Sequence, residues 1–213
     1  MKKRGLLFLI AGIIIITSSY ILGWSTFFTV SSIEIKGTQT YLPAGIVKGE
    51  KLARVEPRII ERRFGKYDWI KSAHVSRNWL TGKVSITIIE RTPIAIYNNL
   101  AIDAQGKSFN IRANNLSRLP KIQAPTVDSA ILAAAFYGQL PADIATQVTL
   151  VKLHSGDTYV VELTTGTGNL ELRWGRSEEN ALKAKVYRAL LLQPENKNIK
   201  RIDVSAPHAP IVK

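Results

Sequence analysis

The first pattern along the chain is an uncharged apolar run from Gly5 to Trp24, which follows directly on three basic residues at positions 2–4. About 20 residues at ~1.5 Å rise each match a hydrocarbon core about 30 Å thick. Basic residues precede the run and none follows it until Lys36, so the positive-inside rule keeps the first residues in the cytoplasm. We therefore expect a cytoplasmic tail at residues 1–4 and a transmembrane helix at residues 5–24. The side chains assigned to the membrane are Leu6, Phe8, Ile13, Ile16, Ile21 and Trp24.

Two other readings of this run stay open. A cleavable signal peptide would use Leu6 to Ile16 as its apolar core and the small residues at 17–19 near its cleavage position. The run continues beyond them to Trp24, however, and an aromatic residue at that end suits a membrane interface. A buried core helix is the second alternative, although soluble domains seldom open with so long an uncharged run beside a basic cluster.

After this run, apolar residues no longer follow one another continuously but alternate with polar ones. Residues 27–36 end in alternating apolar and charged positions, which predicts a half-buried strand that ends at Gly37. Residues 38–50 contain a proline and two glycines without a helical period, so we interpret them as a loop. A short helix is predicted from Pro57 to Gly65. A hairpin follows, whose two arms are Ile70–Arg77 and Lys83–Arg91.

The second half of the chain begins with short apolar runs separated by turn residues. We expect a meander of three strands, then a loop, then a helix from Ser129 to Leu140 that is capped by Asp128 or Ser129. The three strands are Ile94–Tyr97, Leu100–Asp103 and Lys107–Ile111, and the loop is Arg112–Pro125.

Three further alternating runs predict antiparallel strands, and the longest amphipathic pattern follows them. This predicted helix begins with Ser177 as its cap and ends before Pro194, with Leu182, Val186 and Leu190 along one face. A last strand is expected after it. The four strands are Val148–Leu153, Thr158–Leu163, Leu170–Trp174 and Lys200–Val204.

Several of these segments resemble a known family. Trp69 to Trp79 reads WIKSAHVSRNW and Val84 to Ala95 reads VSITIIERTPIA, which is similar to the end of the POTRA domain in FtsQ/DivIB cell-division proteins. The run DAQGKSF at 103–109 resembles the hairpin that opens the β domain of that family. The order of Trp174-Gly175, a helix and the strand at 201–204 resembles the close of the same domain.

The resemblance implies an α+β protein with a single N-terminal transmembrane helix. It implies a small POTRA-type α/β domain at residues 27–92. The chain departs from the family pattern in the connection from Gly37 to Gly49, which is shorter than the family's first POTRA helix needs, so we expect that helix to be reduced or missing. The resemblance also implies an antiparallel FtsQ-type β domain at residues 93–213 with a long C-terminal amphipathic helix. Pro93 cannot donate to a strand ladder, so we place the domain junction at Thr92-Pro93.

The resemblance further implies a binding edge at the end of the chain. In this family the last strand of the β domain receives a strand from a small single-pass coiled-coil partner of the FtsB/DivIC type, which travels with an FtsL-like protein. A frayed tail is the alternative, and Pro207 and Pro210 each remove a backbone donor. The residues assigned to the edge are Val204, Ala206, His208, Ala209, Ile211 and Val212.

The net charge and the absence of cysteine exclude several classes of function. The net charge is +13, and 26 basic against 16 acidic residues remain after positions 2–4 are removed, which leaves +10. A basic exported surface faces anionic lipid headgroups or cell-wall polymers, whereas no nucleic-acid-binding motif is present. Cysteine is absent, so disulfides, thiolate metal sites and a Cys nucleophile are excluded.

No pattern of catalytic residues is found, so we expect a non-enzymatic protein without cofactor or metal. The three histidines, His74, His154 and His208, lack the spacing of metal ligands, and no nucleophile elbow or phosphate-binding loop is present. The function expected is a scaffold in the cell membrane at the division septum, with its C-terminal domains outside the cytoplasm. An envelope assembly or secretion factor is the alternative, and a wall-glycan enzyme with an ungrouped carboxylate pair is a third class.

Overall fold

The computed structural model describes residues 2–23, 28–111, 116 and 118–213, with side chains from residue 5 onward except at 22 and 23. The described chain forms two compact units, Met1–Arg91 and Thr92–Lys213, each with its own contacts. We call them unit 1 and unit 2. Helices and strands occur in both, in agreement with the α+β class.

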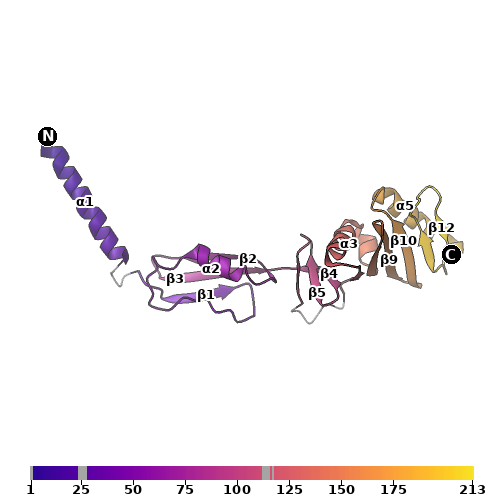
Figure 1. The fold of residues 1–213 in the computed structure, drawn as a ribbon, viewed down its shortest axis with the longest axis horizontal. Helices are drawn as coiled ribbons and strands as arrows, with labels where there is room; N and C mark the ends of the chain where they lie inside the picture. Colours follow the sequence, from indigo (N-terminus) through magenta and orange to yellow (C-terminus); the bar gives the residue numbers. More distant parts are fainter. Residues whose placement is uncertain (1, 24–27, 112–115, 117) are drawn as a thin grey trace. The chain divides into compact units, whose positions relative to one another are not determined.

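Unit 1 begins with helix α1, Lys2–Gly23 (Figure 1). Five of the six side chains assigned to the membrane are exposed on it, and the sixth, Trp24, lies outside the described residues. In the part of the chain whose side chains are described, which includes residues 5–21 of α1, no helix is both long and apolar enough to cross a membrane.

The rest of unit 1 is a three-stranded sheet with one helix. Its elements are β1 (Ser32–Lys36), α2 (Pro57–Phe64), β2 (Ile70–Arg77) and β3 (Lys83–Glu90). The strand order is β1-β3-β2, with β1 parallel and β2 antiparallel to β3. The predicted helix and hairpin are confirmed. Both could be predicted from the sequence, because alternation and a proline at the first helical turn are local signals. The core of this unit includes Leu52, Ile60, Phe64, Trp69, Val75, Val84, Ile86 and Ile88.

The connection between β1 and α2 forms no helix, as the short sequence between them predicted. Gly45 and Gly49 adopt positive φ angles of 64° and 89°, a conformation that right-handed helices do not use. The connection is instead held by backbone hydrogen bonds to residues that directly precede β1. Among them, the N–H of Val30 donates to Glu50 O at 2.8 Å, and the N–H of Leu52 donates to Phe28 O at 3.0 Å.

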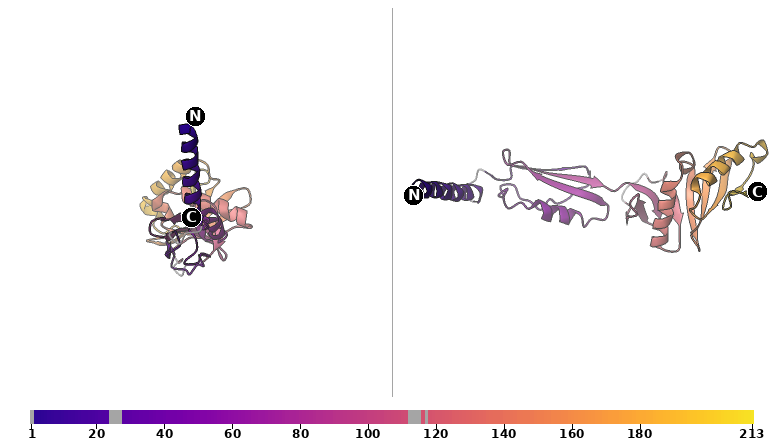
Figure 2. Two further views of the ribbon diagram at one scale, coloured as in Figure 1. Left: turned by 90° about the vertical axis from the view of Figure 1, so that its left-hand side faces the viewer. Right: turned by 90° about the horizontal axis from the view of Figure 1, so that it is seen from above.

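Unit 2 is a nine-stranded sheet whose helices contribute to one shared core (Figures 1 and 2). The strand order is β12-β11-β10-β9-β8-β7-β4-β5-β6. The central strands are antiparallel as predicted, whereas β7 is parallel to both its neighbours and β11 is parallel to β10. The strands are β4 (Pro93–Tyr97), β5 (Leu100–Asp103), β6 (Ser108–Asn110), β7 (Lys121–Gln123), β8 (Val148–His154), β9 (Thr158–Thr165), β10 (Gly168–Gly175), β11 (Arg201–Asp203) and β12 (Ile211–Val212). The helices are α3 (Val127–Gln139), α4 (Ala142–Ala145), α5 (Asn180–Leu191) and the 3-10 turn η1 (Pro194–Asn196).

The loop predicted at 112–125 contains strand β7, so that prediction is wrong over residues 121–123. Only Ile122 of this strand is buried, and its neighbours Lys121 and Gln123 are exposed, so three residues carry too little alternation to be recognised. The strand exists because β4 and β8 supply its hydrogen-bonding partners on both sides.

The cap predicted for α3 is also wrong. The cap is Thr126, whose hydroxyl accepts a hydrogen bond from the N–H of Ser129 at 3.1 Å. The helix therefore begins at Val127, two residues before the predicted start, and Asp128 lies in its first turn, where a negative charge is favourable.

The C-terminal helix is shorter than predicted, with 12 residues starting at Asn180. Ser177 is not its cap, because Glu179 adopts a left-handed conformation (φ 51°) before the helix begins. The side chain of Asn180 instead accepts a hydrogen bond from Trp174 Nε1 at 2.8 Å and donates to Ser177 Oγ at 2.9 Å. These bonds join the end of β10 to the start of α5, and no side chain among the described residues caps the helix.

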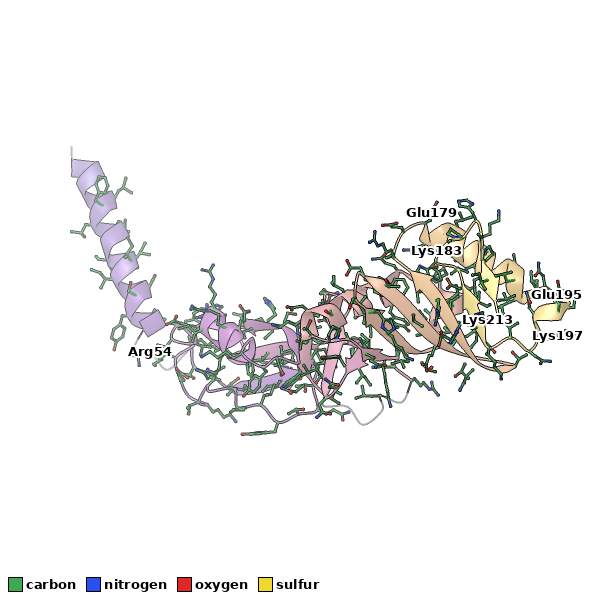
Figure 3. All side chains as sticks on the ribbon, turned by 45° about the vertical axis from the view of Figure 1, so that its right-hand side comes forward. Arg54, Glu179, Lys183, Glu195, Lys197 and Lys213 are labelled. Carbon is green, nitrogen blue, oxygen red and sulfur yellow. The ribbon has the colours of Figure 1, made fainter. Side chains whose placement is uncertain are left out.

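The buried face of α5 also differs from the predicted stripe. Its buried residues are Lys183, Ala184 and Tyr187, whereas Leu182, Val186 and Leu190 are only partly buried (Figure 3 labels Lys183). Lys183 Nζ donates to Arg176 O at 2.7 Å, which keeps the charged group paired at the helix start. Desolvation lowers the pKa of Lys183. A lysine stem therefore occupies a core position next to the predicted apolar stripe.

Candidate partner-binding edge

The last three strands of unit 2 form the edge at which the sequence predicted a binding site. Strand β10 pairs in parallel with β11, and β11 pairs antiparallel with β12. Strand β12 is the first in the sheet order, so the described chain pairs it on one side only. An edge strand of this kind offers backbone groups to a further strand.

The turn that leads from β11 to β12 is held closely against the end of β10. Gly175 has a φ of 73°, and a Cβ atom added there would lie 2.7 Å from the Cβ of Ser205. Only glycine allows this approach. The carboxylate of Asp203 accepts hydrogen bonds from the N–H and Oγ of Ser205 at 2.9 and 2.6 Å, and the N–H of Val204 donates to Arg173 O at 2.9 Å.

The register of the last pair determines which backbone groups of β12 are available. Lys213 (labelled in Figure 3) donates to Arg201 O at 2.9 Å and accepts from Arg201 N–H at 3.0 Å. Hydrogen-bonded and non-hydrogen-bonded pairs alternate in an antiparallel ladder, so Val212, paired with Ile202, directs its N–H and C=O away from β11. Pro210 has no N–H, and the N–H of Ala209 donates to Ala206 O. The accessible edge is therefore short.

The six residues assigned to the edge fall into three environments. Val204 is fully buried in the core of unit 2, so its side chain is not accessible to a partner. Ala206, His208 and Ala209 are exposed and lie in the turn rather than in a strand. Ile211 and Val212 form β12, with side chains 56% and 37% exposed. The structure thus brings only these last two residues to the sheet edge.

An ion cluster that sequence analysis did not identify links β10 to β11. Glu171 lies opposite Arg201 in the strand register. Its Oε1 is 3.0 Å from Arg173 Nε and 2.8 Å from Arg201 Nε. The hydrogen bond from Arg173 and the contact with Arg201 hold the pKa of Glu171 below its ordinary value, although partial desolvation opposes them.

Replacing Glu171 by Gln is expected to remove a pH-dependent part of the stability of unit 2. A carboxylate whose pKa is lowered by folding stabilises the folded state above its unfolded pKa of 4.5, and this contribution is lost as pH falls through the folded pKa. Because the group is partly exposed, we expect less than about 1 kcal/mol at neutral pH. Urea unfolding at pH 7 and at several values below 4.5 measures it. Parallel pH curves for the wild type and E171Q would contradict the prediction.

The three histidines lie in different elements of the fold. His74 lies in β2 of unit 1, His154 ends β8 and His208 lies in the turn before β12. Within the described ranges, no group of three or more His, Cys, Asp or Glu side chains is placed to hold a metal ion. His154 and Asp203 instead line a shallow groove on the sheet with Arg173 and Ser205.

Comparison with known families covers both units. Residues 95–205 match the family described as "Cell division protein FtsQ/DivIB, C-terminal", and residues 28–91 match the family described as "POTRA domain, FtsQ-type". The first match takes in β10, β11 and the turn at Ser205, and it ends before β12.

Three relatives illustrate the extent of the similarity, and each is named cell division protein FtsQ. The protein of Streptomyces venezuelae is 29% identical over 228 residues, which cover 97% of this chain and 80% of the relative. That of Streptomyces bingchenggensis is 29% identical over 216 residues, covering 91% and 79%. That of Salinibacter ruber is 31% identical over 107 residues, covering 46% and 39%.

Proposed function

The chain belongs to the FtsQ/DivIB family of cell division proteins, and we propose that it is a non-catalytic, single-pass scaffold of the division septum. In this proposal the N-terminus is cytoplasmic and α1 is the membrane tether, whereas residues 28–91 of unit 1 and all of unit 2 lie outside the cytoplasm. Unit 2 recruits or links other membrane proteins of the division machinery.

The tether is supported by the sequence and by the exposure of α1. The uncharged run from Gly5 to Trp24 follows a basic cluster, which favours a cytoplasmic N-terminus. Large apolar side chains of α1, including Phe8 and Ile16, are exposed. A row of exposed large apolar side chains requires an apolar environment, and a bilayer supplies one.

The scaffold role is carried by one observation, the singly paired strand β12. Its outward backbone groups at Val212 and the exposed side chain of Ile211 suit the addition of one strand from a partner. The partner we propose is a small single-pass coiled-coil protein of the FtsB/DivIC type together with an FtsL-like protein, as the family resemblance implies. The turn residues Ala206, His208 and Ala209 flank this strand and would contact the same partner.

Depletion and imaging in the source bacterium test the proposed function. We expect depleted cells to grow as filaments, and a fluorescent fusion to gather at the septum. A reporter fused after Lys213 is expected to be active outside the cytoplasm only. Re-expression of the wild-type chain, the control, should restore division. An even distribution around the envelope with normal division would reject the scaffold, and a cytoplasmic reporter signal would reject the proposed topology.

A further inference from the structure

The connection between α1 and the folded part of unit 1 is short. Helix α1 ends at Gly23, and Phe28 is the next described residue. Five peptide steps at no more than about 3.6 Å each limit the distance between these two residues to roughly 18 Å. If α1 spans the membrane as proposed above, the end of unit 1 that carries Phe28 stays close to the bilayer surface.

A cationic loop is bonded to that end. The N–H of Gly49 donates to Val30 O at 2.8 Å, and residues 50 and 52 are bonded to residues 30 and 28, so the loop at 48–54 runs beside residues 28–30, which precede β1. Lys48 and Arg54 are exposed on this loop (Figure 3 labels Arg54). Glu50 is the one acidic residue in 48–54, and its carboxylate accepts a hydrogen bond from Val47 N–H. The loop therefore keeps a positive charge.

The tip of the β2–β3 hairpin is bonded to the same end. Ser31 N–H donates to Gly82 O at 2.8 Å, and Ser31 Oγ donates to Thr81 O at 2.6 Å. Gly82 has a φ of 72°, and an added Cβ would lie 2.4 Å from Thr29 O. Because only glycine permits this contact, the tip is fixed beside residues 29–31.

The side chains on the tip are apolar and aromatic. Leu80 is 95% exposed, and its backbone N–H donates to Asn78 Oδ1 at 3.0 Å, which holds it at the apex of the turn. Trp79 is half-buried, with its ring centroid 6.1 Å from that of Phe28 and 5.1 Å from the guanidinium carbon of Arg77. The leucine therefore has no packing role within unit 1.

This combination matches the chemistry of a membrane interface. Tryptophan favours the headgroup region, an exposed leucine gains free energy when it leaves water, and each Lys or Arg is attracted to anionic lipids. We propose that the end of unit 1 formed by residues 28–31, 48–54 and 78–82 docks on a bilayer surface that contains anionic lipids. Leu80 inserts at the interface, and Lys48 and Arg54 contact lipid phosphates. The inference rests on the proposed tether.

Single labels in the full chain test the inference, because the chain contains no cysteine. Leu80→Cys places a fluorophore at the docked tip. Ile89→Cys, which is 53% exposed, places it near the opposite end of β3, about 20 Å from Lys83 at the tip end of the strand for six residue steps. Ile13→Cys places it in α1. Each labelled chain is reconstituted in phosphatidylcholine nanodiscs with or without phosphatidylglycerol, and quenching by nitroxide-labelled lipid is measured.

In nanodiscs with phosphatidylglycerol we expect strong quenching at positions 13 and 80 and little at position 89. Quenching at 13 with equal, weak signals at 80 and 89 would overturn the docking and leave the tether intact. Absence of quenching at 13 would overturn the tether, and with it the docking. Equal quenching at 80 with and without phosphatidylglycerol would overturn the role of the cations.

Charge removal gives an independent readout. We expect Lys48→Gln with Arg54→Gln to lower the ratio of docked to free unit 1 by roughly 30-fold, since each basic residue near an anionic surface contributes about fivefold. Lys66→Gln with Lys71→Gln, two exposed cations outside the docking end, is the matched control and should change the ratio little. An equal effect of both pairs, or an effect seen only on binding to a soluble anionic polymer, would overturn the proposal.

Discussion

Replacing Trp174 by Ala is expected to lower the free energy of unfolding of unit 2 by about 3–5 kcal/mol. The indole is fully buried, its ring lies edge-on to Phe136 with centroids 5.8 Å apart, and its Nε1 donates to Asn180. Truncation would leave a cavity under β10 and remove the contact that fixes the start of α5. Urea unfolding measures the loss in the free energy of unfolding, and hydrogen exchange shows which unit loses protection.

The two units allow an internal control for this substitution. Because unit 1 has its own core around Phe64 and Trp69, its exchange protection should be unchanged in W174A. Leu192→Ala, at an 84% exposed position, should change the free energy of unfolding by less than about 0.5 kcal/mol. Equal stability of W174A and L192A would contradict the assignment of Trp174 to the centre of the core.

Replacing Ile211 and Val212 by Glu is expected to weaken capture of the proposed coiled-coil partner by at least about tenfold, while unit 2 stays folded. Both side chains are exposed, so charges there cost little in the free protein. In a complex they would be desolvated beside the added strand. Titration of the full chain in detergent with the purified partner measures the affinity.

The matched control lies on another surface of unit 2. Val127→Glu with Leu132→Glu introduces the same two charges on α3, at positions 37% and 52% exposed, so partner affinity should be retained. Deletion from Ala206 onward should reduce capture more strongly than the double substitution, because it removes β12 entirely. Unchanged affinity of the I211E/V212E variant would refute the edge assignment, and an equal loss in the V127E/L132E variant would show that the effect is one of charge alone.

Local patterns in the sequence were sufficient for most elements. The hairpin of β2 and β3, the meander of β4 to β6 and the three strands β8 to β10 follow from alternation and from turn residues a few positions apart. Strand β7 was missed because its pairing with β4 and β8 involves residues distant in the sequence, and three residues carry no period of their own.

At the candidate edge, sequence pattern and family resemblance located the segment 204–212, since it closes the chain after a strand and resembles the end of a family β domain. They did not distinguish the buried residues of this segment from the exposed ones. Val204 packs into the core, the turn residues stay outside the ladder, and Val212 directs its backbone outward, because the register with β11 sets each orientation. The Glu171–Arg201 contact likewise arises from parallel pairing across 30 positions. Periodicity in the sequence indicates which face of a helix or strand a residue occupies, whereas strand pairing between residues distant in the sequence determines which residues lie beside it.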